Sequence, residues 1–456
     1  MNALSGKRVL VVGLGRSGIA AAELCAARGA RVTVTDKRPA AELAGATAKL
    51  PAGVAPELGG HRRESFLSAD LIVLSPGVPE IAELAAARAA GVEITGELEL
   101  ASRFVSATIV AITGTNGKST TTTLVGEMLR ATGRPTFVGG NLGEPLAEAV
   151  GTPAAEAGGF CVVEVSSFQL ETVETFHPRV AVLLNITADH LDRYDGMDGY
   201  AAAKARLFAA QTSTDFAVVN FDDPLAVRAS ETGHGRREGF SIVETLATGA
   251  WLGGPLLLRL PGADPESYPA DLPWLIGQRH NQANALAALL AARLAGASPA
   301  EARAGLLAFR PLAHRMELVA EAGGIAYYDD SKGTNVGAVV AALDGFPRPV
   351  VLIAGGRDKG GDYAPLAAVL GRVGRAAILI GEAADKMQAA FHGVLPVERA
   401  PTLEAAVDAA RRRARPGDAV VLSPACSSFD MFRDYAHRAE AFRAAVARAT
   451  KPEGAP

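Results

Sequence analysis

The sequence predicts an α/β protein with three consecutive domains, each built on a mainly parallel sheet. Short β-branched runs alternate with Ala-rich amphipathic segments along the 456 residues, which is the pattern of repeated βα units. These runs end in Gly, Ser, Asn or Asp, as strands do where their carboxyl ends open onto ligand-binding loops. The length is sufficient for two to four domains, each with its own core.

We expect a first domain over 1–96, a central domain over 97–311 and a C-terminal domain over 312–456. The first should contain the strands RVLVVG, ARVTVTD and LIVLSPG, and the second TIVAITG, FCVVEVSS and VAVLLN. The third should contain PVVLIAGG, AAILIG and AVVLSPA. Between 232 and 277, Gly, Pro and short apolar runs predict small antiparallel strands appended to the central domain, not another βα unit.

Composition and charge exclude several classes of protein. With 49% apolar and 21% charged residues, the profile is that of an ordinary soluble protein. A net charge of −4 argues against a nucleic-acid partner or a polybasic membrane surface, although small anionic substrates stay possible. Three widely spaced cysteines predict neither a disulfide framework nor a zinc site. No signal peptide or membrane-length apolar run is evident, so we expect a cytoplasmic protein without membrane insertion.

The first glycine loop follows the first strand. Gly13, Gly15 and Gly18 have G-x-G-x-x-G spacing, and Asp36 ends the next strand about 20 residues later. Such a loop lets the backbone approach a diphosphate at a helix N-terminus, so we expect a Rossmann-like domain. Two other readings stay open at this stage, a tight turn without a ligand and an NAD-dependent oxidoreductase. Arg16 and the basic pair after Asp36 favour an anionic nucleotide ligand.

The second glycine loop, TGTNGKST, follows a β-branched run and precedes a helical pattern. Gly114, Gly117, Lys118 and Ser119 supply flexible N–H groups, an ammonium for the β/γ-phosphates and a hydroxyl for Mg²⁺. The usual outer glycine is missing, because Ile112 stands at its position. Since strand, loop and helix still occur in the required order, we predict an ATP-binding P-loop ATPase-type fold for the central domain. The alternatives are a solvated lysine at a helix start and a scaffold that binds ATP without turnover.

Two further residues point to chemistry beside this loop. Glu164 interrupts a strand that is apolar on both faces, where an unpaired carboxylate would be costly and a metal partner would remove the cost. A surface position on an edge strand is the alternative for Glu164. Lys204 has Tyr200, Leu207 and Phe208 as its helical neighbours, which predicts a lysine on an apolar face that is paired, snorkelling or neutralised.

Eight segments, taken in order, resemble the Mur ligases, the ATP-dependent amide-forming enzymes of bacterial peptidoglycan synthesis. They are TGTNGKST, EVSSFQLE, NITADHLDRY, YAAAKARLF, GQRHNQANALAA, HRMELV, YYDDSKGTN and LSPACSSFDMF. The resemblance spans nearly the whole chain. The N-terminal GLGRSG and SPGV and the C-terminal SPACSSFDMFRDYAHRAEAF are similar to the branch of the family that adds D-glutamate.

This resemblance implies that the first glycine loop binds UDP-N-acetylmuramoyl-L-alanine. The implied contacts to this substrate are Gly15, Arg16, Ser17, Asp36, Lys37, Arg38, Ser75, Pro76, Gly77, Asn141 and His190. The implied contacts to ATP are Gly114, Thr115, Asn116, Gly117, Lys118, Ser119, Thr120, Asn281, Asn284, Arg315 and Asp330. Two Mg²⁺ ions are implied at Ser119, Glu164, His190 and Lys204, with Lys204 carbamylated.

The resemblance also implies a pocket for the incoming D-glutamate at Thr334, Lys359, Ser428, Phe429 and Tyr435. A surface position is the alternative for Lys359. The implied catalytic residues are Lys118, Glu164, His190, Lys204 and Lys332. We expect a monomer whose C-terminal domain closes about a hinge near 311. A sibling ligase, or a ligase like folylpolyglutamate synthase with another amino acid or acceptor, is the nearest alternative.

Overall fold

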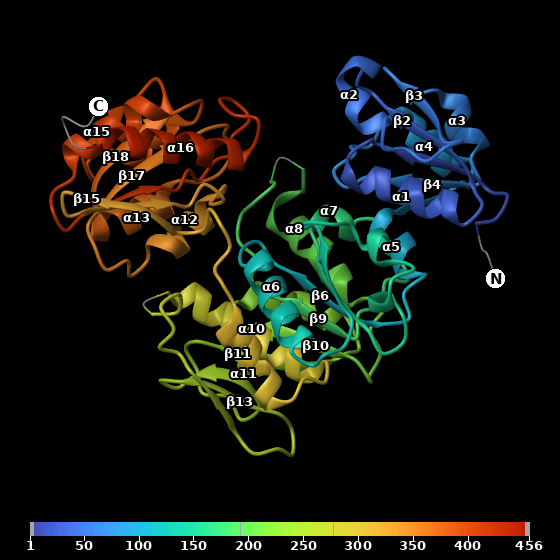
Figure 1. The fold of residues 1–456 in the computed structure, drawn as a ribbon, viewed down its shortest axis with the longest axis horizontal. Coiled ribbons are helices and arrows are strands. Elements are labelled where there is room, and N and C mark those ends of the chain that lie inside the picture. Colours follow the sequence, from blue (N-terminus) through green and yellow to red (C-terminus); the bar gives the residue numbers. More distant parts are fainter. Residues whose placement is uncertain (1–3, 192, 277, 452–456) are drawn as a thin grey trace.

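The computed structural model describes residues 4–191, 193–276 and 278–451, and the fold consists of three α/β units in chain order (Figure 1). Each unit has its own sheet, with five, nine and six strands. The predicted fold class is confirmed. The predicted boundaries near 96 and 311 fall between β5 and α5 and between α11 and β15, and they stay predictions. Within the described ranges, no helix combines the length and apolar character needed to cross a bilayer.

The N-terminal sheet is parallel and has the order β3-β2-β1-β4-β5. Its strands are β1 (Arg8–Val12), β2 (Arg31–Asp36), β3 (Ala55–Leu58), β4 (Leu71–Leu74) and β5 (Glu93–Gly96). Its helices are α1 (Arg16–Ala27), α2 (Ala40–Thr47), α3 (Arg63–Ser68), α4 (Ala82–Ala89) and α5 (Glu97–Ser102). Because β1 lies between β2 and β4, the strand order reverses beside the glycine loop, where such sheets bind ligands.

The third glycine of this loop allows the close approach of α1 to β1. A Cβ at Gly18 would lie 1.9 Å from the carbonyl oxygen of Gly13. This distance is a steric clash, so only glycine fits at position 18. The helix N-terminus is therefore held directly against the end of the strand. This arrangement presents the free N–H groups of the first helical turn toward the carboxyl edge of the sheet.

The central sheet has the order β14-β13-β12-β11-β10-β9-β6-β8-β7. Its strands are β6 (Thr108–Thr113), β7 (Thr136–Gly140), β8 (Phe160–Glu164), β9 (Val180–Leu183), β10 (Phe216–Asn220), β11 (Arg236–Ser241), β12 (Gly249–Leu252), β13 (Leu256–Arg259) and β14 (Glu266–Tyr268). Its helices are α6 (Lys118–Arg130), α7 (Ser167–Leu170), α8 (Gly196–Ala205), α9 (Pro224–Ala229), α10 (Arg279–Leu294) and α11 (Pro299–Ala308). Helices α6, α10 and α11 share one apolar core with the sheet.

One expectation for the central domain needs correction. β13 and β14 are antiparallel additions, as predicted for 232–277. β11, however, pairs in parallel with β10 after α9, so this stretch begins with the strand that completes a βαβ unit, and β12 in turn pairs in parallel with β11. Its first residues, Arg236 and Arg237, are exposed, so the strand lacks the apolar run of its parallel neighbours β9 and β10.

The C-terminal sheet has the order β15-β16-β20-β17-β18-β19, with only β15 antiparallel to its neighbour. Its strands are β15 (Glu317–Ala322), β16 (Ile325–Asp329), β17 (Val350–Gly355), β18 (Gly374–Ile380), β19 (Val397–Arg399) and β20 (Ala419–Leu422). Helices α12 (Val336–Leu343), α13 (Ala364–Val373) and α14 (Ala384–Ala390) pack in one core, and α15 (Leu403–Arg413) and α16 (Tyr435–Ala449) in the core of the other face.

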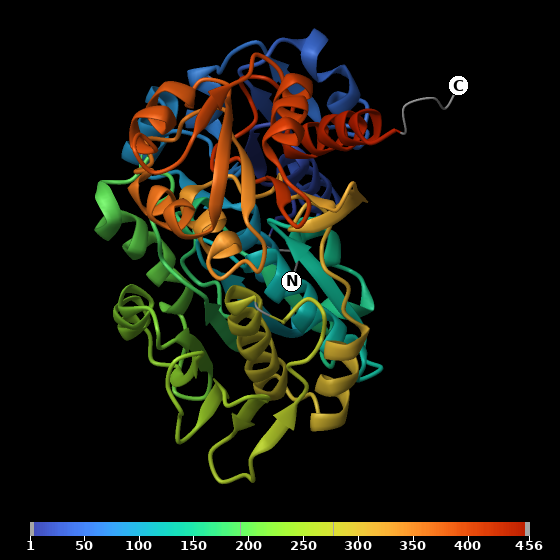
Figure 2. The same cartoon turned by 90° about the vertical axis from the view of Figure 1, so that its left-hand side faces the viewer.

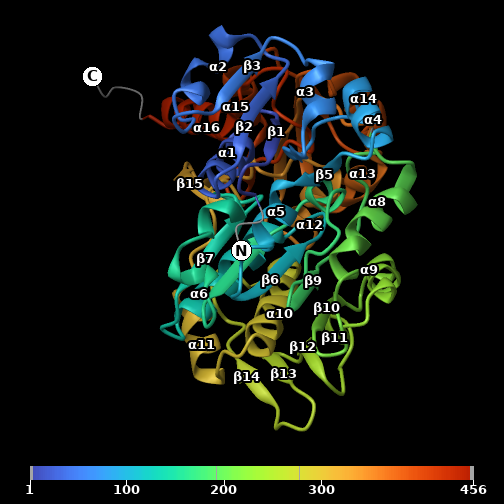
Figure 3. The ribbon, with the colours of Figure 1, turned by 90° about the vertical axis from the view of Figure 1, so that its right-hand side faces the viewer.

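The N-terminal and C-terminal domains lie over the same end of the central domain (Figures 1, 2 and 3). Side-chain hydrogen bonds join all three domains at this end. Arg16 donates to the carbonyl oxygen of Gly143 at 2.6 Å, and Lys332 donates to Ser119 Oγ at 3.4 Å. The carboxyl ends of β6 and β8 open into this junction, so both predicted glycine loops face the same region.

Candidate active site

The second glycine loop connects β6 to α6. Ile112 is fully buried in β6 and belongs to the central core, which explains why no glycine occupies the outer position: the strand is still in progress there. Gly117 has φ +86°, and a Cβ on it would lie 2.2 Å from Asn284 Oδ1 of α10. Glycine is therefore required at 117 both by the backbone conformation and by the packing of Asn284 against the loop.

Asn185, which was not predicted as a site residue, fixes the backbone of this loop. Asn185 follows β9, and its backbone oxygen accepts the N–H of Thr115 at 2.9 Å. Its side chain accepts the N–H of Asn116 at 2.8 Å and donates to the Asn116 oxygen at 3.0 Å. The asparagine at the end of VAVLLN was the available signal. The N–H groups of the first turn of α6 remain directed at the loop opening, as an anion site requires.

Two lysines converge on this loop, the half-buried Lys118 and the buried Lys204. Lys118 Nζ donates to the carbonyl oxygens of Gly114 and Thr115, each at 2.9 Å. Lys204 Nζ donates to the same Gly114 oxygen at 3.0 Å and lies 4.6 Å from the ring centre of Tyr200. Lys204 is 1% exposed, which confirms the predicted position on an apolar face. Burial lowers the pKa of both amines, that of Lys204 well below its ordinary value.

Glu164 is the last residue of β8, which lies between β6 and β7, so the alternative of a surface residue on an edge strand is wrong. The residue is 3% exposed. Its Oε1 accepts a hydrogen bond from Asn141 Nδ2 at 2.7 Å, whereas Oε2 has no hydrogen-bond partner within the described part of the chain. A buried, unsatisfied carboxylate oxygen is costly in isolation and is the kind of ligand that a hard cation uses.

A cleft of about 520 Å³ collects predicted residues from all three domains. It is lined by Gly15, Arg16, Ser17, Ser75, Pro76, Ser119, Asn141, Glu164, Lys332 and Tyr435, and also by Gln169, which was not predicted. The available signal for Gln169 was its place in EVSSFQLE, where its side chain completes the capping box of α7.

The remaining residues predicted for the uridine substrate lie outside this cleft. The Asp36 carboxylate accepts the N–H of Leu14 at 2.8 Å and forms an ion pair with Arg38, so it holds the glycine loop. Lys37 and Arg38 are exposed beside it. Gly77 borders a small cavity between the first two domains, and the His190 ring lies 4.8 Å from that of Phe168.

A second cavity, of about 360 Å³, lies between the central and C-terminal domains. Of the residues predicted to contact ATP, it is lined by Asn116, Gly117, Thr120, Asn281, Asn284, Arg315 and Asp330. Trp274, His280 and Phe309 also line it and were missed. Trp274 and Phe309 stand in no motif, whereas the place of His280 in GQRHNQANALAA was an available signal. Asn281 donates to the Trp274 oxygen at 3.1 Å, and burial raises the pKa of Asp330 to about 6.

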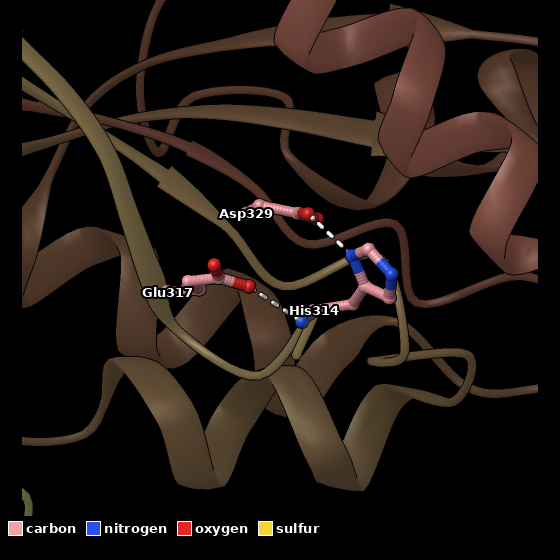
Figure 4. A group of neighbouring side chains, drawn as sticks. All are labelled: His314, Glu317 and Asp329. Atoms are coloured by element: carbon pink, nitrogen blue, oxygen red, sulfur yellow. Dashed lines mark hydrogen bonds and ion pairs between the residues drawn. The ribbon is translucent and has the colours of Figure 1, made fainter. Parts of the chain in front are cut away.

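Arg315 lines this cavity. It lies in a strained turn directly after His314, which is drawn in Figure 4. The flanking residues His314 and Met316 have φ values of +62° and +44°, which non-glycine residues rarely adopt. His314 Nδ1 lies 2.7 Å from Asp329 Oδ2, and the His314 N–H donates to Glu317 Oε2 at 3.0 Å. These contacts fix the turn, and Arg315 Nε is buried without a hydrogen-bond partner among the described residues.

His314, Glu317 and Asp329 are the kinds of residue that bind metals, and their ligand atoms lie within 4.8 Å of one another. Arg443, however, donates to Glu317 Oε2 at 2.5 Å and to Asp329 Oδ2 at 3.4 Å. A guanidinium therefore already balances the two carboxylates. We interpret the cluster as support for the Arg315 turn.

The five residues predicted to bind the incoming amino acid are not gathered in one cavity. Tyr435 lines the three-domain cleft, where Lys332 Nζ lies 5.4 Å from its ring centre. Lys359 Nζ lies 3.4 Å from Asp189 Oδ1. Ser428 is buried, whereas Phe429 is 66% exposed. Thr334 lies two residues after Lys332, and its N–H donates to the Lys332 oxygen at 3.0 Å.

Arg438 of α16 was missed, although its place in SPACSSFDMFRDYAHRAEAF was an available signal. Its guanidinium is fully buried and donates to the Ser331 oxygen at 2.9 Å, to Ser331 Oγ at 3.1 Å and to the Cys426 oxygen at 3.2 Å. These bonds join the loop that carries Lys332 to the loop that carries Ser428. Burial lowers the pKa of Arg438 to about 10.

Comparison with known proteins gives consistent matches along the chain. Three family models match in order: "Mur ligase MurD-like, N-terminal domain" at 7–96, "Mur ligase middle domain" at 112–250 and "Mur ligase, glutamate ligase domain" at 314–426. The UDP-N-acetylmuramoylalanine–D-glutamate ligase of Geotalea daltonii is 49% identical over 446 residues, covering 97% of this chain and 98% of the relative. The ligase of the same name from Anaeromyxobacter dehalogenans is 50% identical over 453 residues, covering 96% and 97%.

Among solved structures, UDP-N-acetylmuramate-alanine ligase MurC from Thermotoga maritima aligns with a TM-score of 0.61 at 18% identity, over 98% of this chain and 100% of that chain. A pseudomurein peptide ligase type C from Methanothermus fervidus aligns with a TM-score of 0.62 at 18% identity, over 97% and 100%. At this identity the structural likeness supports the fold alone. Together with the family models and the full-length relatives, it confirms the resemblance drawn from the motifs, and the chain belongs to the Mur ligase family.

Proposed function

We propose that this protein joins D-glutamate to UDP-N-acetylmuramoyl-L-alanine, with cleavage of ATP to ADP and phosphate, in bacterial peptidoglycan precursor synthesis. The names of the full-length relatives support this reaction, and so does the match to a glutamate ligase domain. The observation that carries it is the three-domain cleft, in which the uridine-type loop, the phosphate loop region and Lys332 converge. We further propose that the protein acts as a cytoplasmic monomer.

The chemistry requires that a carboxylate be activated before an amine attacks it. A carboxylate oxygen of the bound alanine attacks the γ-phosphorus of ATP, and ADP leaves. The amine of D-glutamate then attacks the carbonyl carbon of the acyl phosphate, the nitrogen loses a proton, and phosphate departs with the former carboxylate oxygen. The protein must bring two anionic substrates together, which is a task of positioning and charge neutralisation.

The nucleotide would occupy the cavity between the central and C-terminal domains. Its phosphates would bind the N–H groups at the start of α6, Lys118 and Arg315, whose buried Nε otherwise lacks a partner within the described residues. Lys118 now bonds to the loop's own carbonyl oxygens, so it must turn toward the phosphates when they bind. Asn284 and Asp330 line the same cavity and would contact the nucleoside.

Lys332 is proposed to act at the reacting groups, because its amine reaches Ser119 at the end of the phosphate loop and borders the cleft. Burial and the nearby Arg315 lower its pKa to about 8, so it is mostly charged at neutral pH and can stabilise negative charge on the acyl phosphate. Lys359, Thr334, Ser428, Phe429 and Tyr435 are proposed to receive D-glutamate when it binds.

The residues present fit a magnesium site. Glu164 Oε2 is buried without a partner in the described residues, and the Ser119 hydroxyl lines the same cleft. We propose that these two hold one ion, and that His190 and carbamylated Lys204 hold another. The ions would neutralise phosphate charge when bound. Deep burial and the lowered pKa of Lys204 favour the unprotonated amine, which is the form that reacts with CO₂.

The decisive test is phosphate release by the purified protein with ATP, Mg²⁺ and UDP-N-acetylmuramoyl-L-alanine, with each glutamate enantiomer added in turn. We expect release that depends on the uridine substrate and on D-glutamate, with little response to L-glutamate. A panel of other amino acids separates this activity from that of a sibling ligase. Absence of release under all these conditions would refute the proposed reaction.

A further inference from the structure

The side chain of Asn335 joins the C-terminal domain to the central domain. Asn335 precedes α12, and its Oδ1 accepts the N–H of Ala338 at 2.8 Å, which caps the helix. Its Nδ2 donates to Asn116 Oδ1 and to Asp189 Oδ2, each at 3.1 Å. The amide thus makes three hydrogen bonds at once, and two of them reach across the domain junction.

One partner of Asn335, Asn116, was predicted to contact ATP, and the other, Asp189, contacts the predicted residue Lys359. Asn116 lies in the phosphate loop, where Asn185 fixes its backbone on both sides. Asp189 has a nearly buried side chain, and its Oδ1 lies 3.4 Å from Lys359 Nζ. A continuous polar path therefore leads from the phosphate loop, through the Asn335 amide and the Asp189 carboxylate, to the lysine predicted to bind the amino acid.

The rest of the first turns of α12 packs on the same surface. A Cβ at Gly337 would lie 2.9 Å from Thr187 Oγ1 and 3.3 Å from Asn116 Nδ2, so the helix approaches the central domain as closely as a glycine allows. One turn further, His280 Nδ1 lies 2.9 Å from the Ala341 oxygen. Burial lowers the pKa of His280 to about 4, so the neutral ring donates this bond. α12 is thus one of the elements through which the C-terminal domain docks on the central domain.

We propose that Asn335 is a positioning residue that couples docking of the C-terminal domain to the geometry of the phosphate loop and of Lys359. Its amide is suited to this task because it offers one acceptor for the helix and two donors for the central domain. Lys359 and the phosphate loop have the roles given to them under the proposed function, on which the coupling rests. A serine at 335 could cap α12 but could not bridge Asn116 and Asp189.

The first experiment compares Asn335→Ser with Asn335→Ala in the full chain. We expect both variants to lose about tenfold in kcat/KM for D-glutamate and to raise the KM for ATP, because each lacks the bridging amide. The KM for UDP-N-acetylmuramoyl-L-alanine should stay at the wild-type value, since that substrate is proposed to bind the N-terminal domain. Thr402→Ala, which removes a side-chain cap from α15 in the same domain, is the matched control and should keep wild-type kinetics.

If Asn335 only caps its helix, Asn335→Ser will behave as the wild type and Asn335→Ala alone will be impaired, with a lower melting temperature. That pattern overturns the coupling while leaving the ligase reaction intact. A wild-type protein without D-glutamate-dependent phosphate release is a different failure, that of the proposed function.

A double-mutant cycle tests the bridge from its other side. Asn116→Ser removes the acceptor in the phosphate loop and leaves the cap of α12 in place. If the two asparagines act as one unit, the double variant Asn116→Ser/Asn335→Ser will be little worse in kcat/KM for D-glutamate than the poorer single variant. Losses that multiply would show that the residues act independently and would refute the bridge.

Discussion

At the scale of single residues, Gly117 is constrained both by its backbone conformation and by the packing of a neighbouring side chain. A comparison with a second glycine separates the two effects. Its φ of +86° disfavours any side chain, and its Cβ position is taken by Asn284. Gly133, at the other end of α6, has φ +75° but nothing within 4 Å of its Cβ position. We expect Gly117→Ala to raise the KM for ATP at least tenfold by displacing Asn284. Gly133→Ala should cost only about 1 kcal/mol of stability, with an unchanged KM. Equal KM values for the two variants would contradict this role of the Asn284 contact.

Lys204 gives a second prediction at this scale. If its amine acts as a carbamate, Lys204→Ala should lose most activity and regain part of it when a short carboxylic acid is added, because the acid can replace the carboxylate in the cavity. Lys118→Ala is the matched control: it also removes an amine that donates to the Gly114 oxygen, but one proposed to act as a cation. Initial rates of both variants are measured across a series of acids. If no acid restores activity to either variant, the result argues against the carbamate.

Residues with a motif were predictable, and residues that act through distant polar partners were not. The phosphate loop and the buried position of Lys204 follow from local spacing. Arg438 contacts loops 107 and 12 residues away, and Asn335 contacts side chains 219 and 146 residues away. Such pairs are defined only when the domains have folded and docked. The roles of the predicted residues in binding ATP, the uridine substrate, D-glutamate and Mg²⁺ stay predictions.

At the scale of elements, the buried parallel strands carried the sequence signal and the edge strands did not. β3, β7 and β19 were not predicted, and each lies at an edge of its sheet. Edge strands are short and half-exposed, so their patterns are weak, as in APEL and VER. β10 and β16, with the runs FAVVN and IAYYD, are internal and were simply overlooked.

Helix α5 connects the first sheet to the central domain and contains a buried acid, Glu97. This acid should make the stability of the protein depend on pH. Glu97 Oε1 accepts the N–H of Ala147 at 2.7 Å, whereas Oε2 has no hydrogen-bond partner in the described residues. Burial raises the pKa of Glu97 to about 7. The folded state therefore favours the protonated acid. The contribution of Glu97 to the free energy of unfolding is fully present below pH 4.5 and is lost as the pH rises through 7.

The variant Glu97→Gln should be as stable as the wild type near pH 5 and more stable near pH 8, by up to about 3 kcal/mol. Urea unfolding followed at both pH values measures the difference. Glu64→Gln is the control, because Glu64 is exposed and its substitution should give no pH-dependent difference. A constant difference between Glu97→Gln and the wild type across this range would show that Glu97 does not titrate there.

At the scale of the whole molecule, the two domain junctions differ in kind. One apolar core contains residues of both the first and the central domain, such as Val9, Leu100 and Ile109. The buried cores of the C-terminal domain contain only residues after 324, within the described part of the chain. Its contacts to the central domain include the polar ones of Asn335, Lys332 and His280. Polar contacts can break in water at little cost, so the C-terminal domain is the part expected to move.

Small-angle scattering with an ATP analogue and UDP-N-acetylmuramoyl-L-alanine should therefore report a more compact molecule than the ligand-free protein. Gly337→Ala should reduce this change, because the added methyl would meet Thr187 Oγ1 at 2.9 Å on the docked surface. Gly371→Ala, in α13 of the same domain, meets Val394 at an ordinary 3.5 Å and should close like the wild type. Alanine favours a helix over glycine at both sites, so neither variant should lose stability. Identical profiles with and without ligands would exclude closure, and equal compaction of both variants would exclude docking through α12.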